Sequence, residues 1–190
     1  SSMESGTLST GTARIIAWDC KNERHSGAFS PRTARRFHKR PMNLSAVVIG
    51  RNEESAIGAC LDCLGWCQEI VVVDSGSTDR TREVAAQKGA RVIDHEWEGY
   101  GRQKNFALRQ AANDWVLCID ADEIVSSELR ASIQEALAAP AFRAYEMARC
   151  NRFMGVWLRH GEGYPDWILR LFDRRSAQWS DDAVHERVVT

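Results

Sequence analysis

One stretch decides the fold expected for this chain: Trp115-Val116-Leu117-Cys118-Ile119-Asp120-Ala121-Asp122-Glu123. Five largely apolar residues followed by acidic ones predict a buried strand that delivers carboxylates to the edge of a sheet. Asp120 and Asp122 can share a hard divalent cation such as Mg²⁺ or Mn²⁺, together with water and phosphate oxygens. The alternative is that the acidic residues only favour a helix that begins near Ser126, because negative charge stabilises a helix N-terminus.

Apolar and amphipathic runs alternate on both sides of this stretch. Further strands are predicted at residues 44–49, 70–73, 91–93 and 167–172. Helices are predicted to open at residues 52–55, to follow 74–79 as far as about 88, and to span about 101–112 and 126–138. This β-α-β-α order predicts a three-layer α/β/α fold, with helices on both faces of a mainly parallel central sheet. The strand at 167–172 is expected to make the sheet mixed.

The composition is that of an ordinary globular protein. Of the 190 residues, 44% are hydrophobic and 27% are charged, which is enough for one domain with a good core. The net charge of −1 gives no reason to expect nucleic acid as a partner. The sequence has no apolar run long enough to predict a membrane span, and its N-terminus lacks the apolar stretch of a secretory signal. We therefore expect a cytoplasmic protein.

The first 41 residues differ in kind from the rest. They hold eight basic and three acidic residues and lack sustained periodicity. Such a segment buries little apolar surface, so residues 1–41 are predicted to be a disordered or loosely attached tail and residues 42–190 the folded domain. The basic tail can contact an anionic membrane surface, as in a peripheral protein at the cytoplasmic face of the inner membrane. It can equally be solvated, or be translated sequence upstream of a true start at Met42.

The six cysteines fit a compartment in which thiols stay reduced. Cys60, Cys63 and Cys67 have a spacing that invites a zinc site, but they fall on one face of a predicted amphipathic helix. We expect them to be buried as small hydrophobic residues.

Three polar clusters follow the ends of predicted strands: Asn52 with Glu54, the run 74–79, and Asp120 with Asp122. In such a sheet the ligand site lies outside the carboxyl ends of the strands, so the clusters are expected to converge on one crevice. Within 74–79, a base or ribose can donate hydrogen bonds to Asp74, although a strand-to-helix turn needs no such function. No dinucleotide fingerprint or phosphate loop occurs, so a dehydrogenase or P-loop kinase is poorly supported.

Four ordered motifs match a known family: Arg51-Asn52-Glu53-Glu54, the run VVVDSGSTD at 71–79, Gly101-Arg102-Gln103-Lys104-Asn105, and Asp120-Ala121-Asp122-Glu123. With these motifs the chain resembles the inverting glycosyltransferases of family 2, which have the GT-A fold. It is most similar to bacterial lipopolysaccharide-core β-glycosyltransferases of the β-1,4-glucosyltransferase type, and the segments 167–172 and 184–186 agree. The resemblance covers about Met42 to the end. It implies a further C-terminal portion in the relatives, beyond the position of Thr190.

The resemblance implies roles for the matching residues on the donor side. The residues that would contact the nucleoside, a uracil-type one, are Asp74, Ser75, Asn52 and Glu54. Lys104 and Arg102 would face the diphosphate. Asp120 and Asp122 would be catalytic and would hold the metal, with Asp122 the more direct ligand and Asp120 nearer the ribose or sugar. A nucleoside diphosphate leaving group develops negative charge, which the metal and Lys104 would stabilise.

An inverting transfer also needs a base that takes the proton of the acceptor hydroxyl. The resemblance points to Glu186 in Val184-His185-Glu186, with Asp181, Asp182 and Asp166 as further candidates. This His-Glu segment departs from the Glu-Asp pair that is usual in the wider family. His185 can orient Glu186, approach the metal, or satisfy a local hydrogen bond.

The segment 151–175 is rich in Trp, Arg and Gly. Aromatic faces suit a sugar and arginines suit its anionic groups, so Arg152 and Trp167 are the expected contacts to an acceptor. The alternative is a glycine-hinged loop whose tryptophans pack onto the sheet.

The sequence therefore predicts a glycosyltransferase that moves a hexose such as glucose, with inversion, from a UDP-linked donor to an acceptor of the cell envelope. That acceptor would be a saccharide or glycolipid such as lipopolysaccharide core. One rival is a sugar nucleotidyltransferase, for whose phosphate loop Arg51-Asn52-Glu53-Glu54 is a poor match. The other is a shortened domain that binds nucleotide or carbohydrate without transfer, since the chain stops soon after the predicted base. The oligomeric state does not follow from the sequence.

Overall fold

A computed structural model describes residues 12–15, 42–154, 156–158, 164–181 and 187–189. The helices are α1 (Ile57–Asp62), α2 (Thr81–Gln87), α3 (Tyr100–Gln110) and α4 (Ser127–Ala138). The strands are β1 (Thr12–Ile15), β2 (Met42–Gly50), β3 (Cys67–Asp74), β4 (Arg91–Asp94), β5 (Trp115–Asp120), β6 (Ala144–Arg149), β7 (Arg152–Phe153), β8 (Val156–Trp157), β9 (Asp166–Asp173), β10 (Gln178–Trp179) and β11 (Val188–Val189). None of the helices in the described residues is long and apolar enough to cross a membrane.

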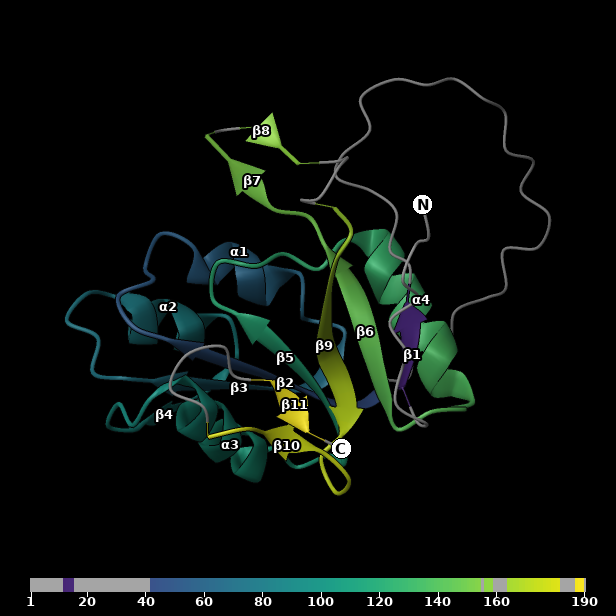
Figure 1. The fold of residues 1–190 in the computed structure, drawn as a ribbon. Helices are drawn as coiled ribbons and strands as arrows, with labels where there is room; N and C mark the ends of the chain where they lie inside the picture. Colours follow the sequence, from purple (N-terminus) through teal and green to yellow (C-terminus); the bar gives the residue numbers. More distant parts are fainter. Residues whose placement is uncertain (1–11, 16–41, 155, 159–163, 182–186, 190) are drawn as a thin grey trace.

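Seven strands form one sheet in the order β1-β6-β9-β5-β2-β3-β4 (Figure 1). The strands β5, β2, β3 and β4 are parallel neighbours, and β9 runs antiparallel between β5 and β6. The chain order reverses at β2, which has β3 on one side and β5 on the other. The predicted mainly parallel sheet, with residues 167–172 as the mixed element, is confirmed.

Two hydrophobic cores cover the two faces of the sheet. Along β2, Leu44, Ala46 and Val48 belong to one core and Val47 to the other, because successive side chains of a strand point to opposite faces. The first core contains the apolar residues of α1, α2 and α4, and the second contains those of α3 and β10. The predicted three-layer arrangement is therefore confirmed.

The first helix begins later than predicted. It was expected to open at residues 52–55, but it begins at Ile57. Asn52 has a φ of 57°, in the left-handed region, so the chain cannot be helical there. The helix ends at Asp62, and Leu64 is buried in the turn that follows.

The prediction that three cysteines share one helix face is wrong. Cys60 lies in α1, Cys63 caps the helix end, and Cys67 begins β3. The prediction of burial is confirmed for Cys60 and Cys67, and burial raises the pKa of the Cys67 thiol to about 12. A thiol at such a pKa stays protonated at neutral pH in the folded protein. Cys150 is disulfide-bonded, which differs from the expectation of reduced thiols.

A short strand lies within the segment that was predicted to be a tail. Thr12–Ile15 form β1, which pairs in parallel with β6 at the edge of the sheet. Arg14 Nε donates a hydrogen bond to Glu146 at 3.0 Å. The structure thus differs from the prediction at these four residues, because a strand of four residues is too short to show a clear periodicity. The division of the chain at residue 41 stays a prediction.

Asp173, the last residue of β9, is a fully buried carboxylate held by two arginines. Its oxygens accept hydrogen bonds from Arg175 Nη2 at 2.7 Å and from Arg143 Nη1 at 2.8 Å. The hydrogen bond from Arg175 outweighs the opposing effect of burial and lowers the pKa of Asp173 to about 2. The carboxylate therefore stabilises the fold only while it is ionised.

Acid should weaken the fold through Asp173. The folded pKa lies below the ordinary value of 3.8, so the stabilisation is complete above about pH 4 and is lost as the pH falls towards 2. We expect Asp173→Asn to lower the free energy of unfolding at neutral pH by about 1–3 kcal/mol. The variant should also show a flatter decrease of that free energy between pH 4 and 2, measured by urea unfolding. Asp62→Asn, which removes an exposed ion pair with Lys88, is the control, and equal pH profiles in all three proteins would contradict the prediction.

Candidate active site

The three predicted polar clusters lie at one edge of the sheet. In the strand register, Gly50 of β2 is paired with Asp74 of β3, and Ile49 of β2 is paired with Asp120 of β5. Chain order reverses at β2, and ligands of open α/β sheets bind at such a switch point, outside the carboxyl ends of the strands. The register thus confirms that the clusters converge.

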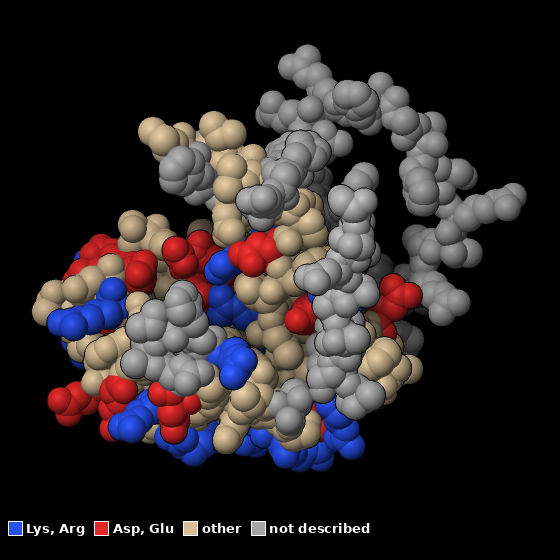
Figure 2. Space-filling view, in the orientation of Figure 1, with Lys and Arg blue, Asp and Glu red and all other residues tan. Residues whose placement is uncertain are grey.

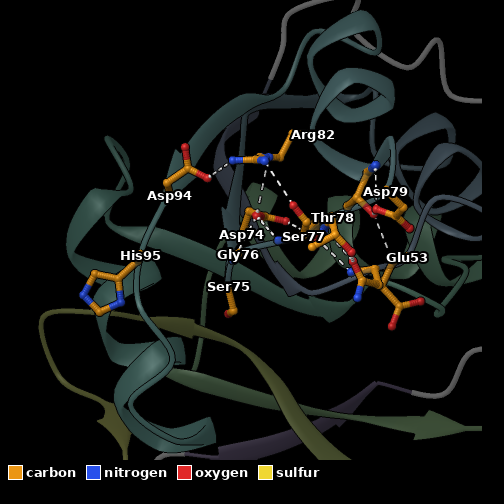
Figure 3. A network of polar contacts seen from close by, with 12 residues as sticks. Glu53, Asp74, Ser75, Gly76, Ser77, Thr78, Asp79, Arg82, Asp94 and His95 are labelled. Carbon is orange, nitrogen blue, oxygen red and sulfur yellow. Dashed lines mark hydrogen bonds and ion pairs between the residues drawn. The ribbon is translucent and has the colours of Figure 1, made fainter.

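The carboxylate of Asp74 is fully buried and is bound by its own loop. Asp74 Oδ1 accepts hydrogen bonds from the backbone N–H groups of Ser77 at 2.8 Å and Gly76 at 3.1 Å, and Oδ2 accepts one from the Ser77 hydroxyl. Arg82 Nε lies 3.8 Å from Oδ1 (Figure 3). Asp74 therefore fixes the shape of the turn after β3, in which Gly76 supplies a φ of 80°. Its contact with a base stays a prediction.

Asn52 and Glu54 join this loop to the end of β2. Asn52 Oδ1 accepts a hydrogen bond from Thr78 N at 2.8 Å, and Asn52 N donates to Ser77 Oγ at 2.8 Å. Glu54 Oε2 accepts a hydrogen bond from Arg80 N at 3.1 Å. The structure therefore brings both residues together with the 74–79 loop. The 50–54 and 74–79 loops form one wall of the candidate site.

Replacing Asn52 should separate the effects of its side chain and its backbone. We expect Asn52→Ala to lower the free energy of unfolding by about 2 kcal/mol, because it loses the Thr78 hydrogen bond and strains a left-handed backbone. Glycine adopts the left-handed backbone without strain, so Asn52→Gly should lower the free energy of unfolding by only about half as much. Urea unfolding measures both values, and equal losses would show that the backbone conformation contributes nothing.

Helix α3 brings Lys104 to the site from the other face of the sheet. Lys104 is buried, and its Nζ lies 3.4 Å from Asp120 Oδ1 and 4.5 Å from the centre of the Trp179 ring. The same helix binds the end of β3, because Gln103 Nε2 donates a hydrogen bond to Ser75 Oγ at 3.0 Å. Helix α3 thus places Lys104 beside Asp120 and joins Ser75 to the same side of the sheet, while the contacts of both residues with a donor stay predictions.

The start of α3 lies directly against the backbone after β10. A Cβ on Gly101 would lie 2.0 Å from the carbonyl oxygen of Ser180 and 3.2 Å from its carbonyl carbon. Only glycine permits this approach. Gly101 therefore lets α3 lie close enough to β10 for Lys104 to contact Trp179.

Arg102 lies apart from Lys104. Two residues along a helix place side chains on nearly opposite faces, and Arg102 is exposed on the wall of an open cavity of about 550 Å³ between α3 and β10–β11. Among the contacts of the described residues, none joins Arg102 to Asp120. Of the two residues predicted to face the diphosphate, only Lys104 lies beside the acidic pair.

Asp120 and Glu123 share a buried cation, Arg170 of β9. Arg170 Nη2 donates hydrogen bonds to Asp120 Oδ2 at 2.5 Å and to Glu123 Oε1 at 3.0 Å. Burial by itself raises the pKa of Asp120, but Arg170 and Lys104 reverse this and hold it below its ordinary value. Burial raises the pKa of Glu123, and the lowering by Arg170 does not cancel that effect.

Sequence reasoning assigned no role to Arg170, although a signal was present. The residue is a single charge within the otherwise apolar run 167–172, and arginines are almost never fully buried unless they are paired. Its partners could not be read from the sequence, because they depend on β9 lying next to β5.

Asp122 is the exposed member of the acidic pair. Among the described residues none donates a hydrogen bond to its carboxylate. Its charge adds to burial in raising the pKa of Glu53, so the two carboxylates lie near each other. An exposed carboxylate with uncommitted oxygens fits a hard cation that takes its other ligands from water and phosphate. No three His, Cys, Asp or Glu side chains of the described residues form a complete metal site by themselves.

An ionic cluster extends from Glu123 towards the β7–β8 hairpin. Arg149 Nη2 lies 2.7 Å from Asp166 Oδ2, and Arg149 Nη1 lies 3.7 Å from Glu123 Oε1. Burial alone raises the pKa of Asp166, but Arg149 and Asn151 reverse this and lower it. Asp166, one of the candidate bases, is therefore an ionised and paired carboxylate.

The predicted acceptor contacts are placed only in part. The guanidinium of Arg14 lies 4.9 Å from the centre of the Trp167 ring, so β1 covers one face of this tryptophan. Arg152 begins β7, and its side chain is not described. Asp181 is exposed at the cavity beside α3. Glu186, with His185 and Asp182, lies outside the described residues, so the base stays a prediction.

Charge is unevenly spread over the face seen in Figure 2. Asp and Glu side chains gather on the upper side of that view, below the β7–β8 hairpin, and Lys and Arg side chains are frequent along the lower edge. A surface region rich in Asp and Glu attracts a metal cation more readily than it attracts a free anion.

Comparison with known proteins decides the family. The family model for glycosyl transferase family 2 matches residues 45–188, which is most of the chain. The chain belongs to glycosyl transferase family 2. The GT-A-like fold expected from the resemblance is thereby confirmed, together with the mixed sheet described above.

Two curated relatives of this family 2 chain are glycosyltransferases by name. It is 45% identical over 153 residues to the lipopolysaccharide core biosynthesis glycosyltransferase LpsC of Rhizobium meliloti, an alignment that covers 77% of this chain and 57% of the relative. It is 42% identical over 153 residues to an uncharacterized glycosyltransferase of Rickettsia prowazekii, covering 77% of this chain and 52% of the relative. The chain thus spans little more than half the length of these relatives.

Among solved structures, the chain is similar to glucosyl-3-phosphoglycerate synthase from Mycobacterium tuberculosis, in complex with Mn²⁺, UDP and glucosyl-3-phosphoglycerate. The sequence identity is 28% and the TM-score is 0.45, over 53% of this chain and 42% of that chain.

Proposed function

We propose that this family 2 chain carries the donor site and the catalytic centre of a metal-dependent, inverting glycosyltransferase. The donor is a UDP-linked hexose such as glucose. The acceptor is a saccharide or glycolipid of the cell envelope, such as lipopolysaccharide core, and the name of the relative LpsC supports this class of acceptor.

The observation that carries the proposal is the unequal state of Asp120 and Asp122. Asp120 is bound by Lys104 and Arg170, whereas Asp122 is exposed and receives no hydrogen bond from the described residues. Asp122 would hold Mg²⁺ or Mn²⁺, which when bound neutralises charge on a diphosphate leaving group. Lys104 would add a fixed positive charge from the protein beside the same group.

The rest of the site divides into a nucleoside side and an acceptor side. The wall made by the 50–54 and 74–79 loops supports a nucleoside pocket, because its turn is fixed by Asp74 and its two loops are joined by Asn52. On the acceptor side, Glu186 would take the proton of the attacking hydroxyl as that oxygen bonds to the anomeric carbon and the diphosphate leaves.

Calorimetric titration of UDP and GDP, with and without Mn²⁺, tests the proposal. We expect UDP to bind, to bind more tightly with Mn²⁺, and to bind more tightly than GDP. Release of UDP from UDP-glucose, with and without a lipopolysaccharide-core saccharide, then tests transfer. A folded protein that binds neither nucleotide would overturn the proposal. Binding of UDP without any release from UDP-glucose would point to a nucleotide-binding domain that does not transfer.

A further inference from the structure

Arg170 is a buried charge at the centre of the sheet. It lies on β9, and only 6% of its side chain is exposed. Its Nη2 is shared by two carboxylates, and its buried Nη1 has no hydrogen-bond partner among the described residues. A buried ion pair contributes little net stability, because desolvation offsets much of the Coulombic gain. The contacts of Arg170 therefore call for an explanation other than stability.

The two carboxylates that Arg170 binds belong to one turn. Asp120 ends β5, and Glu123 N donates a hydrogen bond to the Asp120 carbonyl at 3.0 Å. Glu123 Oε2 in return accepts a hydrogen bond from Asp120 N at 3.0 Å. Residues 120–123 therefore form a closed turn, and Arg170 binds it through the half-buried side chains of Asp120 and Glu123.

Asp122 is the remaining acidic residue of this turn, and the described residues give its side chain no hydrogen bond of its own. Its position therefore depends on the backbone of the turn. The oxygens of Asp120 are already divided between two cations, with Oδ1 beside Lys104 at 3.4 Å and Oδ2 on Arg170 at 2.5 Å. These contacts fix the turn from α3 on one side and from β9 on the other.

We propose that Arg170 is a positioning residue for donor binding, which fixes the 120–123 turn through Asp120 and Glu123 and so directs Asp122 towards the diphosphate and its metal. Residues that orient metal ligands in this way commonly decide metal affinity. This inference rests on the proposed donor site. A guanidinium suits the role because its fixed planar geometry sets the direction of each hydrogen bond, which an ammonium group on a flexible chain does not.

The C-terminal end of β9 provides a matched control. There Asp173 is also a buried carboxylate bound by arginines, with Arg175 Nη2 at 2.7 Å. Asp173 lies three residues after Arg170 along β9. In the described part of the chain, neither Asp173 nor Arg175 contacts a predicted donor residue. Loss of Arg175 should therefore cost stability without affecting the donor site.

The test is calorimetric titration of UDP with Mn²⁺ into the wild-type chain, Arg170→Lys, Arg170→Gln and Arg175→Gln. We expect both Arg170 variants to bind UDP about 10- to 100-fold more weakly in the presence of Mn²⁺. Arg175→Gln should have a lower Tm and an unchanged Kd. Arg170→Lys keeps the buried charge, so it tests the inference even if Arg170→Gln does not fold.

A charge-balanced double variant separates positioning from simple charge neutralisation. Arg170→Gln combined with Glu123→Gln removes one cation and one carboxylate, and Lys104 still accompanies Asp120. We expect its Tm to exceed that of Arg170→Gln, while its Kd for UDP with Mn²⁺ stays weak. Recovery of the Kd together with the Tm would overturn the inference, as would unchanged Kd values in the single variants. Wild-type protein that binds no UDP would instead overturn the proposed function, and the inference with it.

Discussion

Replacing Asp122 with asparagine should abolish the Mn²⁺-dependent part of UDP binding and leave the fold intact. Asparagine keeps the shape of the side chain but removes the charge that a hard cation requires. We expect a loss of about 100-fold in UDP affinity with Mn²⁺, which is about 2.8 kcal/mol of binding free energy. Because Asp122 is exposed and makes no hydrogen bond to the described residues, its loss should change the free energy of unfolding by no more than about 0.5 kcal/mol.

Two comparison variants make this result specific. Glu135→Gln removes an exposed carboxylate from α4 and should alter neither binding nor stability. Asp120→Asn should lower stability as well as affinity, because it leaves the buried cations Lys104 and Arg170 without their shared counter-ion. A protein with Asp122→Asn that still binds UDP more tightly when Mn²⁺ is added would refute the assignment of the metal to Asp122.

Among glycine-to-alanine substitutions at the described glycines, Gly101→Ala should cause the largest loss of stability. The new Cβ would lie 2.0 Å from the backbone oxygen of Ser180, and backbone atoms cannot turn aside as a side-chain end can. We expect a loss of about 3 kcal/mol or more in the free energy of unfolding. The variant should also bind UDP more weakly, because α3 must move away from β10 and carry Lys104 with it.

Gly65→Ala is the matched control for this prediction. Gly65 lies in the turn after α1, and a Cβ there would meet only the Asp62 carbonyl oxygen at 3.9 Å. Its free energy of unfolding should stay within about 0.5 kcal/mol of wild type. Urea unfolding compares the two variants. If Gly101→Ala is as stable as Gly65→Ala, the close contact between α3 and Ser180 is not a feature of the folded protein.

Local sequence pattern was sufficient to predict the strands and helices whose conformation depends mainly on their own residues. The apolar runs at 70–73 and 115–119 became the buried strands β3 and β5, because side chains covered on both faces must be apolar throughout. Ser126 was correctly read as the beginning of a helix, and its hydroxyl oxygen accepts a hydrogen bond from Leu129 N at 3.1 Å. The register of β2 with its neighbours then brought the predicted clusters to one edge.

Long-range pairing explains what the sequence could not predict. The contacts of Arg170 with Asp120 and Glu123 cross about 50 residues of chain and depend on an antiparallel strand beside β5. The hydrogen bonds of Asp74 within its own loop could not be predicted either, since the same carboxylate could have faced a ligand. Glu54 and Asn52 were correctly grouped with the 74–79 run, but their partners are backbone groups, which sequence patterns do not distinguish.

The antiparallel strand β9 has a consequence for how the protein is made. Residues 166–173 are near the C-terminal end of this chain, yet they occupy the middle of the sheet, between β5 and β6. During synthesis, β5 and β6 emerge from the ribosome before the strand that joins them, so each presents an unpaired edge until β9 has also emerged. A released chain that ends before Asp166 should therefore be prone to aggregation and should depend on chaperones, whereas one that contains all of β9 should be far less so.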